Sequence, residues 1–114
     1  MLCYRIFVLV VLTAVTQLAA PNVVAQSPSA GLKIANRLCA RCHAIRPGQT
    51  GQHPLAPTFQ DIAKRYPVWG LQEALAEGIL VGHASMPAFV LPPADVGNLL
   101  TYMDTLTPPK KKDR

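Results

Sequence analysis

Cysteine is scarce in this chain of 114 residues, and its scarcity excludes a disulfide-stabilised fold. Of three cysteines, Cys3 lies ahead of a long apolar stretch near the N-terminus, and only two residues separate the others, Cys39 and Cys42. Histidine is equally rare, with three copies. A domain of this size rarely builds a sufficient core alone, so we expect another crosslink or a bound group to stabilise it.

The chain also lacks an apolar run long enough to span a bilayer. Residues 6–20 carry no charge, but these fifteen residues fall short of the roughly 20 that a membrane helix needs. Arg5 before this run and Val23-Val24-Ala25 after it are typical of a secretory signal peptide. We therefore interpret residues 1–25 as a signal that is cleaved after Ala25 and directs export to the periplasm. Retention of this segment as a membrane anchor is the alternative; otherwise we expect no stable membrane insertion.

Positive charge exceeds negative charge, but most of the excess lies in a short tail. The formal net charge is +5, and residues 108–114 carry a net three of these charges. Pro108 and Pro109 prevent a helix from continuing into the lysines, so we interpret residues 108–114 as a basic, disordered tail. Docking of this tail to an acidic partner is the alternative. No basic patch is interleaved with aromatic residues, which argues against nucleic-acid binding.

The sequence Cys39-Ala40-Arg41-Cys42-His43 has the spacing used for covalent attachment of a c-type haem. Residues three apart share one face of a helix, so both sulfurs can reach the same edge of a porphyrin, and His43 can bind the iron. Two other interpretations are a thiol–disulfide oxidoreductase and a zinc site. The first needs a βαβ pattern that the sequence lacks, and the second would take two ligands from adjacent residues.

Helical patterns predict an all-α fold of about four short helices. Apolar residues at helical spacing predict a first helix from Ser29 to about the end of the haem motif. Thr58 can cap a short second helix that ends at Pro67. Residues 71–79 predict a third helix, and Pro93 is a favourable first residue for a fourth. No segment alternates for long enough to predict a strand.

A low-spin electron carrier needs a second protein ligand on its iron, and the chain offers few candidates. Met86 precedes a proline, which favours extended backbone from which the thioether can project. His53 and His83 are the imidazole alternatives, and either can instead be a surface histidine. Met103 falls on the apolar face of the last predicted helix, so we expect it to pack in the core.

Four segments together resemble the small class I c-type cytochromes. They are the haem motif, Ala56-Pro57-Thr58-Phe59, Ser85-Met86-Pro87-Ala88-Phe89 and a closing amphipathic helix. The resemblance implies a monohaem cytochrome c domain over residues 26–107, in which helices wrap around one covalently bound haem c. It also implies that Gly31 and Tyr102 lie where the first and last helices cross.

The resemblance further implies a role for each site residue. Cys39 and Cys42 attach the haem, and His43 and Met86 are the axial ligands of the iron. The Pro57 carbonyl accepts a hydrogen bond from the other nitrogen of the proximal histidine. Apart from the resemblance, four side chains that can donate hydrogen bonds are candidates for contacts with the haem carboxylates: Tyr66, Trp69, Arg46 and Arg65. Trp69 can instead be part of the core.

With both axial positions filled, the site is closed to substrate, and no nucleophile or acid–base pair lies beside the motif. We therefore expect an electron-transfer protein rather than an enzyme: a soluble periplasmic one-electron carrier. Its partners would be a dehydrogenase-type donor and an oxidase or reductase acceptor. The alternatives are a haem-c subunit of a larger redox enzyme complex, or a ligand-binding haem sensor if the distal ligand is labile.

Overall fold

The structure is a computed structural model, and it describes residues 24–79 and 85–109. Most of the predicted signal peptide, His83 and the lysines of the tail lie outside these described residues. Within them the chain forms four α-helices and one 3-10 helix, and no strand. In chain order the helices are α2 (Pro28–Leu38), α3 (Phe59–Arg65), η1 (Val68–Leu71), α4 (Gln72–Glu77) and α5 (Pro93–Asp104). The prediction of an all-α fold of about four short helices is confirmed.

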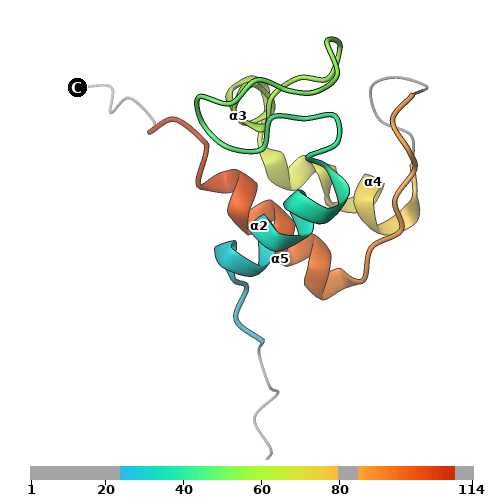
Figure 1. The fold of residues 1–114 in the computed structure, drawn as a ribbon. Helices are drawn as coiled ribbons and strands as arrows, with labels where there is room; N and C mark the ends of the chain where they lie inside the picture. Colours follow the sequence, from blue (N-terminus) through green and yellow to red (C-terminus); the bar gives the residue numbers. More distant parts are fainter. Residues whose placement is uncertain (1–23, 80–84, 110–114) are drawn as a thin grey trace, which may run out of the picture.

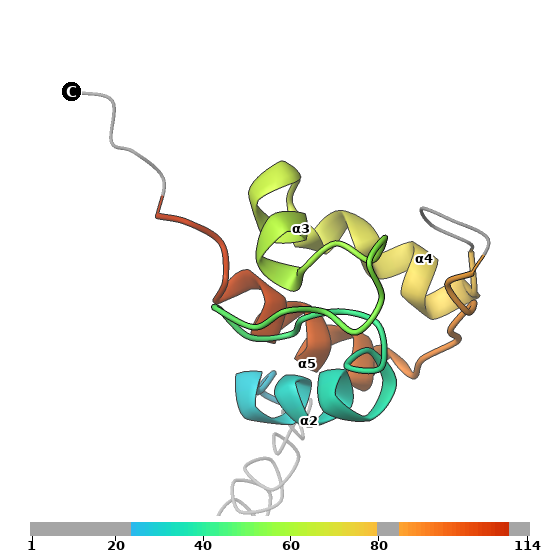
Figure 2. The same ribbon diagram turned by 45° about the horizontal axis from the view of Figure 1, so that its top comes forward.

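Helices α2 and α5 cross and pack against each other, and α3 and α4 lie on the other side of α5 (Figures 1 and 2). The crossing depends on Gly31. A Cβ atom added there would lie 2.0 Å from the carbonyl oxygen of Asn98 and 2.7 Å from Cβ of Tyr102. Two backbones this close leave no room for a side chain, so the predicted pairing of Gly31 with Tyr102 is confirmed.

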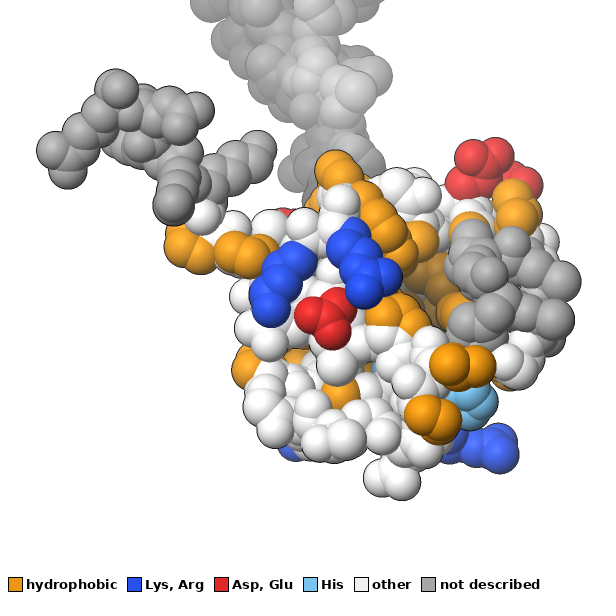
Figure 3. Space-filling model, turned by 90° about the horizontal axis from the view of Figure 1, so that it is seen from above, with side chains coloured by type: hydrophobic (Ala, Val, Ile, Leu, Met, Phe, Trp, Pro, Cys, Tyr) orange, Lys and Arg blue, Asp and Glu red, His pale blue; other side chains and the backbone are white. Residues whose placement is uncertain are grey.

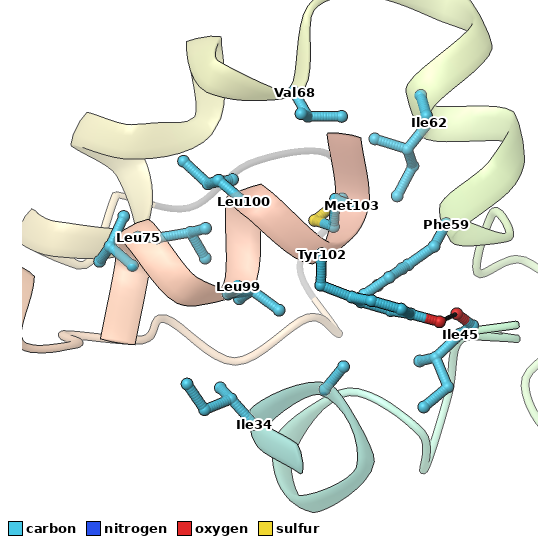
Figure 4. Close-up of a cluster of buried hydrophobic side chains, with 13 residues drawn as sticks. Ile34, Ile45, Phe59, Ile62, Val68, Leu75, Leu99, Leu100, Tyr102 and Met103 are labelled. Carbon is cyan, nitrogen blue, oxygen red and sulfur yellow. Dashed lines mark hydrogen bonds between the residues drawn. The ribbon is translucent and has the colours of Figure 1, made fainter. Parts of the chain in front are cut away.

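The hydrophobic core surrounds α5, which supplies three of the four largest fully buried side chains (Figure 4). Leu99 and Leu100 are almost completely buried, and burying a leucine fully stabilises a fold by about 1.5–3 kcal/mol. Every other helix contributes to the same cluster. Its members from outside α5 include Ile34, Ile45, Phe59, Ile62, Val68 and Leu75. Met103 is also buried here, as the sequence predicts.

Local sequence signals determine where three of the helices begin or end. The Thr58 hydroxyl accepts a hydrogen bond from the backbone N–H of Asp61 at 3.0 Å, which caps α3 as predicted. Gly78 ends α4 in the left-handed conformation, with φ of 75°. Pro93 is the first residue of α5. The third helix, predicted over residues 71–79, is η1 followed by α4. It ends at Glu77, so Ile79 lies beyond the helix and is exposed.

The first helix is shorter than predicted, because it ends at Leu38, before the haem motif. The backbone N–H groups of Cys39 and Ala40 both donate to the Ala35 carbonyl, at 2.9 and 3.0 Å. The Ala35 carbonyl oxygen thus accepts two hydrogen bonds, and the regular α-helical hydrogen-bond pattern ends here. The motif therefore lies in the turn after the helix rather than on the helix itself.

Candidate cofactor site

The turn after α2 keeps the two cysteines on one side of the chain. The backbone N–H groups of Cys42 and His43 donate to the Cys39 carbonyl at 3.1 and 2.9 Å, so the chain continues to curl beyond the helix. Both cysteines are half-buried free thiols, and both line the same cavity. The two cysteines lie on the same side of the chain, as predicted, but they lie in a turn and not on a helix.

The Cys39 thiol is held in its protonated form. Burial, together with the neighbouring Cys42, raises the pKa of Cys39 from 9.0 to about 11. A thiol–disulfide oxidoreductase needs the opposite shift, because its attacking group is a thiolate with a lowered pKa. The environment of this pair therefore does not favour the oxidoreductase interpretation.

His43 is buried, with 8% of its surface exposed, and a single hydrogen bond determines which ring nitrogen carries the proton. Its Nδ1 lies 2.6 Å from the Pro57 carbonyl oxygen. A carbonyl can only accept, so Nδ1–H is the donor and Nε2 keeps its lone pair. The ring also packs against Phe59, with centroids 5.8 Å apart. A fixed imidazole with a free Nε2 is what an iron ligand requires.

The loop from Ala44 to Thr58 brings Pro57 to His43, and hydrogen bonds near its two ends close it. Phe59 N–H donates to the Ala44 carbonyl at 2.9 Å. The buried Tyr102 hydroxyl donates to the Ile45 carbonyl at 2.7 Å and so ties the start of the loop to α5. The position of His43 is thus set by two helices and a closed loop.

The cavity that the cysteines and His43 line is walled mainly by apolar side chains from α3, η1, α4, α5 and residues 85–91. Its volume is about 170 Å³, which is far more than a single ion needs and is enough for part of an organic cofactor. On the face shown in Figure 3, hydrophobic side chains gather around a hollow in the surface. An apolar cleft bordered by two thiols and a histidine fits a covalently bound haem.

Two methionines line this cavity. Met86 is half-buried, and Pro87 and Phe89 from the same segment line the wall with it. Met103 from α5 also contacts the cavity, in addition to its predicted place in the core. The sequence did not indicate this second contact, because a helix face that points to a core and one that points to a cofactor have the same periodicity.

Of the two interpretations given for His53, a ligand of the iron or a surface histidine, its position agrees better with a residue of the cavity. It is half-buried and lines the wall. Its backbone N–H donates to the Cys42 carbonyl at 3.2 Å, and its Nδ1 accepts from Leu55 N–H at 3.2 Å. Its place between the haem motif and Pro57, in a loop that must fold back on the motif, could have indicated this. The alternative ligand His83 lies outside the described residues.

The four candidates for haem-carboxylate contacts differ in position. Tyr66 lines the cavity. Trp69 is partly exposed on η1 and is not among the residues of the wall, and Arg65 is exposed on α3. Arg46 lies beside the Tyr102 hydroxyl and counteracts the rise in its pKa. Of the four, the structure brings only Tyr66 to the cavity.

The zinc interpretation gains no support from the described part of the chain. Within it, no three His, Cys, Asp or Glu side chains are grouped so that they could hold a metal ion. Likewise, no helix in the described ranges is both long enough and apolar enough to cross a membrane.

The fold and the cavity define a small c-type cytochrome. Comparison with known proteins agrees: the family model described as "Cytochrome C oxidase, cbb3-type, subunit III" matches residues 26–103, and the chain belongs to this family. Cytochrome c-552 of Bradyrhizobium diazoefficiens is 35% identical over 78 residues, which cover 68% of this chain and 73% of that protein. No solved structure gives a significant match. The cofactor of this electron-transfer family is one covalently bound haem c with its iron.

Proposed function

We propose that Cys39 and Cys42 form the two thioether bonds to the haem. Three observations support this assignment: both thiols are free, both line the cavity, and the turn after α2 holds them on one side of the chain. Burial raises the pKa of Cys39 to about 11, so this thiol is protonated at neutral pH.

His43 is the proximal ligand through Nε2. Its Nδ1–H donates to the Pro57 carbonyl, which fixes the tautomer and the ring plane and increases the basicity of Nε2. Pro57 therefore acts on the cofactor through His43. Phe59 packs against the same ring and restricts its rotation.

Met86 is the distal ligand. Its thioether comes from a segment outside the helices that lines the cavity, and the proline after it restricts its backbone. Met103 lines the same cavity, but it is fixed in the core by α5. A thioether opposite a histidine favours reduced iron and so raises the potential relative to two imidazoles.

The function that follows is one-electron transfer by an exported periplasmic carrier. When bound, the haem supplies the redox chemistry, and its iron alternates between the ferric and ferrous states. The apolar cleft would hold the haem, with a candidate ligand for each axial position. This pairing of His43 and Met86 on one cavity is the observation that carries the proposal. A dehydrogenase-type donor and an oxidase or reductase acceptor would dock transiently.

The test is ligand binding by the ferrous protein made with a c-type maturation system. We expect the haem to stay attached during denaturing electrophoresis and the ferrous form not to bind carbon monoxide. Rapid carbon monoxide binding by the unmodified protein would show an open distal position and replace the carrier with a ligand-binding sensor. Haem that acid–acetone extracts would contradict covalent attachment.

A second candidate function is a haem-c subunit of a larger redox complex. The description of the matched family as a subunit of cbb3-type oxidase favours it. Fractionation of the native cells separates the two. A carrier is recovered alone in the periplasmic fraction, whereas a subunit is recovered with membrane proteins. A chain that keeps residues 1–25 as an anchor is also recovered in the membrane fraction.

A further inference from the structure

Residues 26 and 27, just ahead of α2, are attached to α5 by side-chain hydrogen bonds. Ser27 N–H donates to the Asn98 side-chain oxygen at 2.7 Å. The Thr101 hydroxyl lies 2.9 Å from Oε1 of Gln26 and donates to it. The Gln26 amide lies over Gly97, where an added Cβ would be only 2.7 Å from Nε2. The glutamine side chain therefore has a specific place on the folded domain.

The backbone at this point is accessible and not helical. Val24 is 76% exposed, Ala25 and Gln26 are also exposed, and residues 24–27 belong to no helix. Cleavage at the predicted site after Ala25 makes Gln26 the first residue of the exported chain. This step rests on the export part of the proposed function.

We propose that Gln26 of the exported chain is converted to pyroglutamate. The free α-amino nitrogen attacks Cδ of its own side chain and forms a five-membered lactam. The bond between Cδ and Nε2 breaks, and Nε2 leaves as ammonia with the proton that the amine gives up. Oε1 remains as the lactam carbonyl oxygen. The reaction needs no oxidant, reductant or second substrate.

The hydrogen bond from Thr101 favours this reaction. A hydroxyl that donates to Oε1 polarises the carbonyl and stabilises the negative charge that develops on oxygen when the amine attacks. The same hydroxyl also lies 2.7 Å from the Gly97 carbonyl, so its single proton is divided between two acceptors.

The electrostatics of α2 also favour the uncharged product. Ser27 is the N-cap of α2 and Pro28 its first residue, so an ammonium group on Gln26 lies next to the positive end of the helix dipole. The first turn of α2 has no acidic residue that could offset this charge. Lactam formation removes the charge.

The mass and N-terminal sequence of the protein recovered from the periplasm test the proposal. We expect the mass of residues 26–114 plus one haem, less one ammonia, and complete resistance to Edman degradation. Gln26→Asn is the matched control, because it keeps a side-chain amide but would need a four-membered ring. This variant should give a full-mass chain and a readable N-terminal sequence.

Three results would overturn the proposal: a readable glutamine at the N-terminus, a first residue other than Gln26, or equal blocking of Gln26→Asn. None of them depends on the redox behaviour. The mass of the haem and the absorption spectrum of the same sample report separately on the proposed carrier function, so the two proposals can fail independently.

Discussion

The two sides of the cofactor cavity differ in how the chain holds them. On the cysteine side, His43 is fixed by the Pro57 carbonyl, and the loop behind it is closed by hydrogen bonds to Ala44 and Ile45. On the methionine side, residues 85–90 lie outside any helix, and Leu91 N–H donates to the Leu75 carbonyl at 2.9 Å where the segment reaches α5. Hydrogen bonds within the chain therefore hold the cysteine side in place. Met86 lies on a segment without helical structure, and a bond to the iron would add a further restraint on it.

Packing shows the same difference. A Cβ atom at Gly51 would lie 2.9 Å from the Cys42 carbonyl oxygen, so the loop lies tightly against the haem motif. Across the cavity, Val90 is 73% exposed. With His43 as a ligand, as we propose, the fold already holds one ligand in place, which lowers the conformational entropy lost when the cofactor binds.

The largest effect should follow from removing the covalent attachment of the haem on the cysteine side. In Cys39→Ser combined with Cys42→Ser, the haem should become extractable and the domain should largely unfold, because its apolar cavity would lose the group that fills it. Far-ultraviolet circular dichroism and denaturing electrophoresis measure the two effects. Cys42→Ser alone retains one thioether and should keep attached haem. A double variant that folds normally would show that the fold does not depend on the attached cofactor.

A smaller but still large effect is expected at the helix crossing that supports the cysteine side. Gly31→Ala places a methyl group against the Asn98 carbonyl oxygen and should lower the free energy of unfolding by about 3 kcal/mol. Gly70→Ala is the matched control: a Cβ there has no neighbour within 4 Å, so the change should stay within about 0.5 kcal/mol. Equal denaturation midpoints for the two variants would contradict the close approach of α2 and α5.

Substitution of Met86 on the methionine side should change the absorption spectrum more than it changes the free energy of unfolding. Met86→Ala should abolish the weak near-infrared band of thioether-to-iron charge transfer, lower the reduction potential and admit carbon monoxide. The cost in unfolding free energy should be about 2 kcal/mol, and both thioethers should remain. Met103→Leu is the control for the other cavity methionine and should keep the band. If Met86→Ala keeps the spectrum of the unmodified protein and His83→Ala changes it, the ligand is His83 and the potential is lower than we propose.

The parts of the fold that the sequence predicted correctly depend on local interactions. Thr58 and Pro93 each act within one turn of their own helix, so the residue type alone indicates the geometry. The pair Gly31 and Tyr102 joins distant segments, and only the resemblance to a known family indicated it. The assignments of the signal, the tail and the individual haem ligands remain predictions.

The parts that were wrong or missed depend on tertiary structure. The apolar periodicity continues past Leu38, and the sequence has no glycine or proline to show that the helix ends there. His53 reaches the cavity only because its loop folds back and bonds to the Cys42 carbonyl. Ile79 continues the apolar face of α4, but Gly78 has already turned the chain.

The smallest effect on stability is expected at the Tyr102 hydroxyl, which binds the start of the loop of residues 44–58 to α5. Tyr102→Phe leaves the buried Ile45 carbonyl without its donor and should cost about 1 kcal/mol at neutral pH. Thr107→Val removes an exposed hydroxyl from a longer contact of 3.4 Å with Asp104 and should change stability by less than about 0.5 kcal/mol.

The stabilising effect of Tyr102 should also depend on pH. Burial raises the pKa of Tyr102 above its ordinary value of 10.0, and Arg46 opposes this only in part. The folded protein thus keeps the phenol proton that the unfolded chain loses near pH 10, so stability falls as the pH rises from there through the folded pKa. Urea unfolding at pH 7 and above pH 10 should show a smaller alkaline loss in Tyr102→Phe than in the unmodified protein. An identical loss in both would mean that the hydroxyl titrates as an exposed phenol does, and that the bond to Ile45 does not hold the loop against α5.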